Sequence, residues 1–440
     1  MAGVRDKELV TMAGWPLGMN NLAAETDMPR NEDGAQVALR DAVNVDLDRG
    51  GKARLRQGYE LAAGGTNTHS AWSDDYLPFG LYVAGNTLRV FHADASTDAL
   101  VPGLASGLPL SYARINDAVY WTNAAQCGAI TLDLEAVPWS CPNPSSQPAV
   151  TAGAGALDAG TYQVAVTFVE PSGRESGASL AVMIDIAEGG ALALTQIPQP
   201  ADPLVRIRVY ATSGNDGVLR AAATLPHGST AYAITQKPQG RPLETQHLRP
   251  MPPGQIIRHG NGRQFVARGR EVLFSPALRY GLHDPRKARV GFAGRVDLME
   301  FVGDGSDGAG LFVADAQRTY WLGAPDPANW SQVIASPIGA VPGTTAMASG
   351  EVWGLQTKKP LPVWLARNGR LCVGLPGGDI YHPQPSDRGT EAVIDQAQRG
   401  ALLFREGRGN RQIIAALQGA QPQGLAITDR VITRVYRHGE

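Results

Sequence analysis

Hydrophobic and polar residues alternate along much of the chain, and the first clear case lies near the amino terminus. In LRDAVNVDLDRGG (residues 39–51), apolar residues 43, 45 and 47 fall on one face and polar residues 44, 46 and 48 on the other. A period of two predicts a half-buried β-strand. A Gly-Gly turn and a second alternating run, residues 52–56, follow it. We therefore predict a hairpin that pairs an acidic strand face with a basic one.

The same alternation recurs in short runs through most of the remaining chain. Gly85-Asn86 splits the run GLYVAGNTLRVFHA, and Asn261-Gly262 splits QIIRHGNGRQF. Such dipeptides between apolar runs predict hairpin turns. The hairpins recur at irregular spacings of roughly 30–50 residues, and repeated units of about four short strands are typical of β-propellers. With no sustained helical period in the sequence, we predict an all-β fold with a β-propeller-like body.

The middle of the chain has a different character. The stretch CPNPSSQPAVTAGAGALDAG, which begins at residue 141, has the Pro/Gly/Ser/Ala composition of a linker. About five short strands follow, spaced as in a small β-sandwich. GTYQVAVTFVEPSGRES and VRIRVYATSGNDG resemble segments of a fibronectin type III-like module. The predicted segments are an extended or hairpin region that joins the propeller (1–70), a first propeller part (71–145), the inserted sandwich (146–245) and a second propeller part (250–440).

Composition narrows the class of protein. The chain has 440 residues with 39 Lys and Arg against 41 Asp and Glu, so it has no basic field for nucleic acid. Gly 52 and Pro 31 make about one residue in five, which fits turns between many short strands. The three cysteines form no C-x-x-C pair, which favours folding in a reducing cytoplasm. No signal peptide and no membrane-spanning run is expected.

Two acidic stretches raise the question of a metal site. An EF-hand calcium loop needs Gly at position 6 and Glu at position 12. Counting from Asn44, position 6 is Arg49 and position 12 is Leu55, so a strand and a turn explain the stretch better. Asp304 and Asp307 lie in GDGSDGAG, where a single copy of a G-x-D pattern favours a hairpin loop. We predict no metal.

Catalytic motifs are weak throughout. There is no G-x-S-x-G, the eight histidines are scattered, and the Gly-rich runs do not open a helix. A glycosidase pair of carboxylates stays open, although nothing marks two of them. The eight tryptophans fit core packing better than a sugar-binding groove. We predict neither an enzyme nor a cofactor.

Several motifs occur in the order seen in a known family. An Asn-Asn dipeptide, a proline-bearing segment, an R-x-A-x-N-V-D strand, an Arg-rich strand ending in R-x-G-Y and an H-S-x-W turn follow one another. This order resembles the amino-terminal part of phage tail nozzle, or tubular tail, proteins, which complete the tail tube of short-tailed phages. GRQFVARGREVLFSPAL, LFVADAQRTYWLG and NGRLCVGLPGGDIYHP resemble their propeller segments. The matching residues proposed for assembly are Asn20, Asn21, Arg40, Asn44, Asp46, Arg54, Arg56, Tyr59, His69 and Trp72.

The resemblance implies a structural virion protein of a bacteriophage tail, made in the host cytoplasm. It implies a nozzle- or adaptor-like ring, a hexamer by analogy, that completes the tail channel and helps to retain and pass the genome. Its implied partners are further copies, other tail or connector proteins, and genomic DNA that passes without sequence-specific binding. The alternative is a tail protein that binds or cleaves glycans on the host surface. Nozzle, adaptor and tail-tip positions all stay open.

Overall fold

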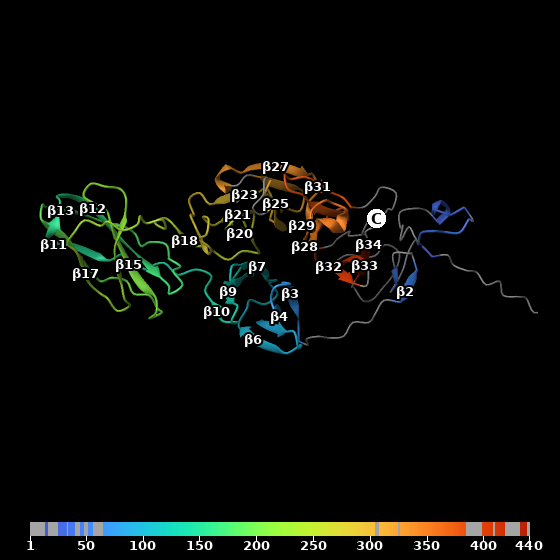
Figure 1. Ribbon diagram of the computed structural model, residues 1–440, viewed down its shortest axis with the longest axis horizontal. Helices are drawn as coiled ribbons and strands as arrows, with labels where there is room; N and C mark the ends of the chain where they lie inside the picture. Colours follow the sequence, from blue (N-terminus) through green and yellow to red (C-terminus); the bar gives the residue numbers. More distant parts are fainter. Residues whose placement is uncertain are drawn as a thin grey trace, which may run out of the picture. The chain divides into compact units, whose positions relative to one another are not determined.

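The structure is a computed structural model. In the part of the chain that it describes, the secondary structure consists of β-strands and a few short 3-10 turns. The described residues are 14–15, 25–32, 34–39, 45–47, 52–55, 65–303, 308–323, 326–383, 398–407, 410–418 and 432–437. The chain divides into two units (Figure 1). One comprises residues 63–291, and the other comprises residues 1–62 together with 292–440.

Outside the sandwich, the unit 63–291 contains three antiparallel sheets of four strands each. Two of them are simple meanders, in which each strand pairs with the next along the chain. The first sheet is β3 (His69–Ser73), β4 (Phe79–Ala84), β5 (Thr87–His92) and β6 (Thr97–Val101). The second is β7 (Ser111–Ile115), β8 (Ala118–Thr122), β9 (Cys127–Thr131) and β10 (Ala136–Val137). The third is β19 (Ile256–Gly260), β20 (Arg263–Arg268), β21 (Glu271–Phe274) and β23 (Arg289–Gly291), and β22 (Leu282–His283) pairs instead with β18 (Arg249–Pro250).

Turn chemistry and alternation explain these sheets. Asn261 and Gly262 have φ angles of 45° and 65°, the left-handed conformation that a two-residue hairpin turn requires. Neighbouring residues of β8 face opposite ways, because side chains alternate across a strand. Trp121 packs in a core shared with the first sheet, and Tyr120 packs in a core shared with the third. The second sheet therefore buries both faces, one against the first sheet and one against the third, as a blade of a propeller does.

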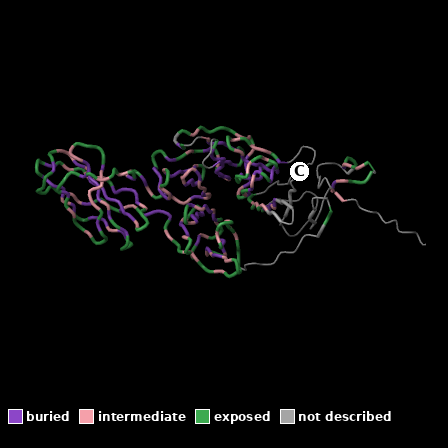
Figure 2. The backbone as a smooth tube through the Cα atoms, in the orientation of Figure 1, coloured by how far each residue is buried: buried purple, intermediate pink, exposed green. Residues whose placement is uncertain are grey.

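The sandwich forms two sheets within the same unit. One sheet is β11 (Ala149–Leu157), β14 (Gly190–Thr195) and β17 (Tyr232–Ile234). The other has the order β13 (Val182–Ile186), β12 (Gly160–Val169), β15 (Arg206–Ala211) and β16 (Arg220–Leu225). Residues from both sheets share one apolar core, which includes Leu192 and Val164. Figure 2 shows buried backbone segments within the sandwich.

The unit formed by 1–62 and 292–440 contains two further four-stranded meanders and shorter pieces. The meanders are β24 (Leu298–Val302), β25 (Gly310–Ala314), β26 (Thr319–Gly323), β27 (Ser331–Ser336), and β28 (Ala340–Ser349), β29 (Pro360–Ala366), β30 (Leu371–Gly374), β31 (Ile380–Tyr381). The other elements are a three-stranded sheet of β32 (Arg399–Gly407), β33 (Asn410–Gln418) and β34 (Ile432–Arg437), the pair β1 (Val45–Leu47) and β2 (Ala53–Leu55), and 3-10 turns at Glu25–Asp27, Pro327–Asn329 and Gly350–Trp353. Phe312 packs against Trp364, with ring centroids 5.4 Å apart, in a core that joins the two meanders.

The structure confirms the predicted all-β, propeller-like fold, and it contains a β-sandwich. The fibronectin type III-like assignment of that sandwich stays a prediction. Two local expectations were wrong. Residues 149–157, predicted as linker, form β11, because pairing with β14 overrides the weak strand preference of Ala and Gly. The HSAWS stretch, expected as a turn, is strand β3, with an irregular register between His69 and Trp72.

Candidate functional site at the sandwich junction

The predicted assembly residues fall into three groups. Asp46 and Arg54 lie directly opposite each other in the β1–β2 hairpin, which confirms the predicted strand pair. His69 and Trp72 lie in β3, in the other unit. Six predicted residues lie outside the described part of the chain: Asn20, Asn21, Arg40, Asn44, Arg56 and Tyr59. Asp304 and Asp307 also lie outside it, so the hairpin loop without a metal expected there stays a prediction.

His69 and Trp72 contribute to packing between the first two sheets. The half-buried Trp72 contacts the core they share, and its ring lies 6.0 Å from that of Tyr112, centroid to centroid. The Nδ1 atom of His69 lies 2.8 Å from Ser70 Oγ, and that oxygen accepts a hydrogen bond of 2.9 Å from the Leu110 amide. His69 and Trp72 therefore take part in the packing of these sheets, and their role in assembly stays a prediction.

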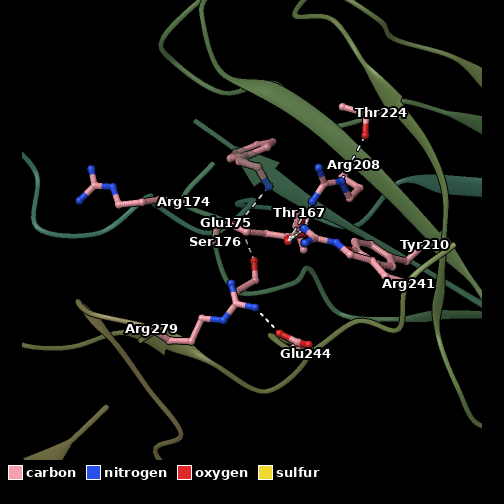
Figure 3. Close-up of polar contacts among 12 residues, drawn as sticks. Thr167, Arg174, Glu175, Ser176, Arg208, Tyr210, Thr224, Arg241, Glu244 and Arg279 are labelled. Atoms are coloured by element: carbon pink, nitrogen blue, oxygen red, sulfur yellow. Dashed lines mark hydrogen bonds and ion pairs between the residues drawn. The ribbon is translucent and has the colours of Figure 1, made fainter. Parts of the chain in front are cut away.

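The most connected polar group in the sandwich is the carboxylate of Glu175, which is 6% exposed. Its Oε1 accepts hydrogen bonds from Thr167 Oγ1 at 2.7 Å and from the Tyr210 hydroxyl at 2.6 Å. Its Oε2 accepts from Arg208 Nη1 at 3.1 Å and from Arg241 Nη2 at 2.7 Å. Figure 3 shows these groups converging on Glu175. A buried carboxylate is tolerated only when it is paired and hydrogen-bonded in this way.

Strand register explains how these groups meet. Thr167 of β12 lies directly opposite Arg208 of β15, and Tyr210 is two residues along β15 on the same face. Glu175 reaches that face because it forms a β-bridge with Val169 just after the hairpin turn EPSGR. Arg241 comes from the segment that leaves the sandwich, so it covers the face from outside.

The neighbouring residue, Arg174, points away from Glu175 in Figure 3. Its Nε donates a hydrogen bond of 2.6 Å to Glu170, and its Nη atoms donate to the carbonyls of Trp139 and Pro138, each at 3.4 Å. Burial raises the pKa of Tyr120 in β8, and the positive charge of Arg174 opposes that rise. The hairpin 170–178 therefore makes two sets of contacts. Glu175 contacts the sandwich, and Arg174 contacts the second four-stranded sheet and the residues that follow it.

A second set of contacts joins the two segments that flank the sandwich. The side chain of Asn143 donates to the Leu248 carbonyl at 3.0 Å and accepts from the Gly177 amide at 3.0 Å. Arg249 donates to the Ala178 carbonyl at 3.0 Å. A Cβ atom on Gly177 would collide with the Leu248 carbonyl oxygen, so only glycine fits this close approach. The hairpin 170–178 is thus bonded to both the incoming and the outgoing chain.

Burial raises the pKa of hydroxyl and thiol groups at this junction and elsewhere in the described chain. Burial, followed by the hydrogen bond to Glu175, raises the pKa of Tyr210 to about 12, so its hydroxyl stays protonated at neutral pH. Burial also raises the pKa of the cysteine thiols at 127, 141 and 372 to about 12, which leaves little nucleophilic thiolate. Among the described residues, no three His, Cys, Asp or Glu side chains gather as metal ligands. In the part of the chain that the structure describes, no helix is long and apolar enough to cross a membrane.

Sequence reasoning missed the Glu175 cluster. Its guanidinium partners lie 33 and 66 residues away along the chain, and no local spacing links them to EPSGRES. The one available signal was a charged residue just after the turn of a predicted hairpin.

No protein-family model and no curated protein matches the sequence. Solved structures similar to the chain include BBS1N in complex with ARL6DN, at 12% identity and a TM-score of 0.31, covering 82% of this chain and 94% of that one. The N-terminal domain of Nup159 has 9% identity and a TM-score of 0.27, covering 77% and 71%. Hsv2 of Kluyveromyces lactis has 6% identity and a TM-score of 0.26, covering 77% and 86%. With such TM-scores, these likenesses add nothing to the fold established by the sheets.

Proposed function

We propose that the chain is a structural protein of a bacteriophage tail, a nozzle- or adaptor-like ring component that completes the tail channel. The observation that carries the proposal is the ordered series of amino-terminal motifs from residue 20 to residue 72. In this proposal the protein helps to retain the genome before ejection and lets it pass afterwards.

The hairpin β1–β2 supports the assembly role of the motif. Asp46 and Arg54 are register partners in the strand pair, so the motif places residues of opposite charge at opposite positions of two short strands. Two such strands alone are marginally stable in water. We propose that contacts with a neighbouring copy or another tail protein stabilise this hairpin in the assembled ring.

The sheets and the junction support a mechanical role. A ring that holds pressurised DNA must resist deformation, and close-packed sheets with buried faces are stiff. The two arginines that meet Glu175 are engaged by a carboxylate, as is Arg174 by Glu170. Near-neutral overall charge suits a channel through which DNA slides, because DNA binding needs an excess of Lys and Arg.

Immunogold electron microscopy of purified phage particles tests the proposal, with an antibody raised against residues 146–245. We expect label at the head–tail junction or the distal tail. Antibody pre-absorbed with the recombinant protein should remove that label. Unlabelled particles, with the protein abundant in the same lysate, would contradict the proposal and favour a soluble glycan-binding or glycan-cleaving protein.

A further inference from the structure

One edge of the sandwich lacks the protection that sheet edges normally have. Strand β11 pairs with β14 from Ala149 to Ala154, and no strand among the described residues pairs with its other side. Residues 151–156, with the sequence TAGAGA, are all exposed. Figure 1 places β11 at the margin of the sandwich. The amides of Gly155 and Ala156 bond to the Gly189 and Thr235 carbonyls. From Ala149 to Ala154, however, the backbone N–H and C=O groups on the outer side of β11 pair with no strand among the described residues.

Proteins usually blunt such edges with charged residues, proline, bulges or short strands. The other three edge strands follow this rule: β16 begins at Arg220, β13 carries Asp185, and β17 has only three residues. Strand β11 spans nine residues without a charge or a proline. Its irregular register begins only after Ala154. The preceding 149–154 edge can therefore receive another strand.

The topology of the sandwich points to the same edge. The sheet order β16-β15-β12-β13 matches the G-F-C-C′ order of an immunoglobulin-like sandwich, which makes β11 and β14 equivalent to strands B and E. In that architecture strand A lies beside B. Here the chain before β11 contains Pro142, Pro144 and Pro148, which lack the N–H that a paired strand needs. The position of strand A is thus unfilled by the adjoining chain.

We propose that β11 pairs antiparallel with β11 of a second copy of this chain. The stretch 149–154, with the sequence AVTAGA, is self-complementary, because uncharged side chains no larger than valine meet similar side chains in any antiparallel register. The contact is two-fold symmetric and joins the two three-stranded sheets into one of six strands. A two-fold contact joins copies in pairs and closes no ring by itself, so this inference does not depend on the proposed function.

The particle mass of the purified full chain tests the pairing, measured by native mass spectrometry and sedimentation equilibrium. The variant carries Ala152→Lys and Ala154→Lys, which set charges against each other across the two-fold edge. The control is Ala233→Lys, an exposed alanine at the opposite edge of the same sheet. We expect the double variant to have half the mass of the wild type, whatever the ring state, and the control to keep the full mass. Equal masses for wild type and double variant would overturn the proposal.

Cysteine cross-linking gives a second measurement that tolerates a folding defect in the lysine variant. Single cysteines are placed at residues 151, 152, 153 and 154 in turn, with Ala233→Cys as the control. The residue nearest the two-fold axis should give covalent dimers on oxidation, because paired residues bring their Cβ atoms within disulfide range. The native thiols, whose pKa is raised, react slowly. Failure of all four positions to cross-link above the control would also overturn the pairing.

Discussion

At the scale of single residues, the protein uses its buried charges to fix the backbone. Glu175 has four hydrogen-bond donors around one carboxylate, and Arg208, whose side chain is 18% exposed, is one of them. Removing the negative charge would leave that guanidinium without a charged partner in a mostly buried place. Such a loss is more damaging than the loss of a surface ion pair.

We expect Glu175→Gln to lower the local free energy of unfolding of β12 and β15 by about 2–3 kcal/mol. Hydrogen exchange of the full chain, followed on peptides from these strands, measures it. The matched control is Glu244→Gln, since Glu244 pairs with Arg279 at the surface and its side chain is 68% exposed. The control substitution should lower the local free energy of unfolding of these strands by less than about 1 kcal/mol. Equal effects of the two substitutions would show that the Glu175 cluster adds no special stability.

The pKa of Asp284 gives a prediction for the stability of the folded protein at low pH. It is 5% exposed, and Arg286 donates to it through its backbone amide, Nε and Nη2. The Arg286 hydrogen bonds lower the pKa of Asp284 to about 2. The unfolded chain then binds more protons than the folded chain between about pH 4 and pH 2, so this stabilisation is lost as pH falls through that window.

The Tm difference between wild type and Asp284→Asn should therefore be constant from neutral pH to about pH 4 and narrow toward pH 2. Differential scanning fluorimetry across this range measures it. Using the difference cancels the titration of all other carboxylates. A Tm difference that stays constant down to pH 2 would mean that the pKa of Asp284 is not lowered.

At the scale of elements, the hairpin 170–178 joins the sandwich to the segments that flank it. Its tightest point is Gly177 against the Leu248 carbonyl. Gly177→Ala should loosen this contact by about 1–3 kcal/mol, because a side chain forced into a packed site displaces the backbone. Peptides covering residues 243–251 should then exchange hydrogen about tenfold faster or more. Gly217→Ala is the control, since a Cβ there meets no atom within 4 Å, and it should leave exchange unchanged.

Elements with local signals were predictable from the sequence. Alternation and the Gly85-Asn86 turn predict β4 and β5. In the structure β4 ends just before that dipeptide, and β5 begins just after it. Strand β11 was not predictable, because its Ala and Gly residues carry no strand preference and it forms only through its partner, β14. The Glu175 cluster was hidden for the same physical reason. Its members meet through strand register and chain return, which one-dimensional spacing does not encode.

At the scale of the whole molecule, the proposed ring and the proposed β11 contact make different demands. A ring needs a heterologous contact that closes, whereas the β11 contact is two-fold. The cysteine and lysine variants of β11 should therefore alter pairing of copies without altering ring closure. The hexamer that the family resemblance implies belongs to the proposed assembled particle.

The copy number of the protein in purified particles tests the proposed tail function most directly. Quantitative mass spectrometry with isotope-labelled peptides from residues 263–279 and 360–383 measures it against the major capsid protein. The account predicts six copies, or a multiple of six, in each particle. Absence from the particles, or three copies as expected of a trimeric receptor-binding protein, would contradict it.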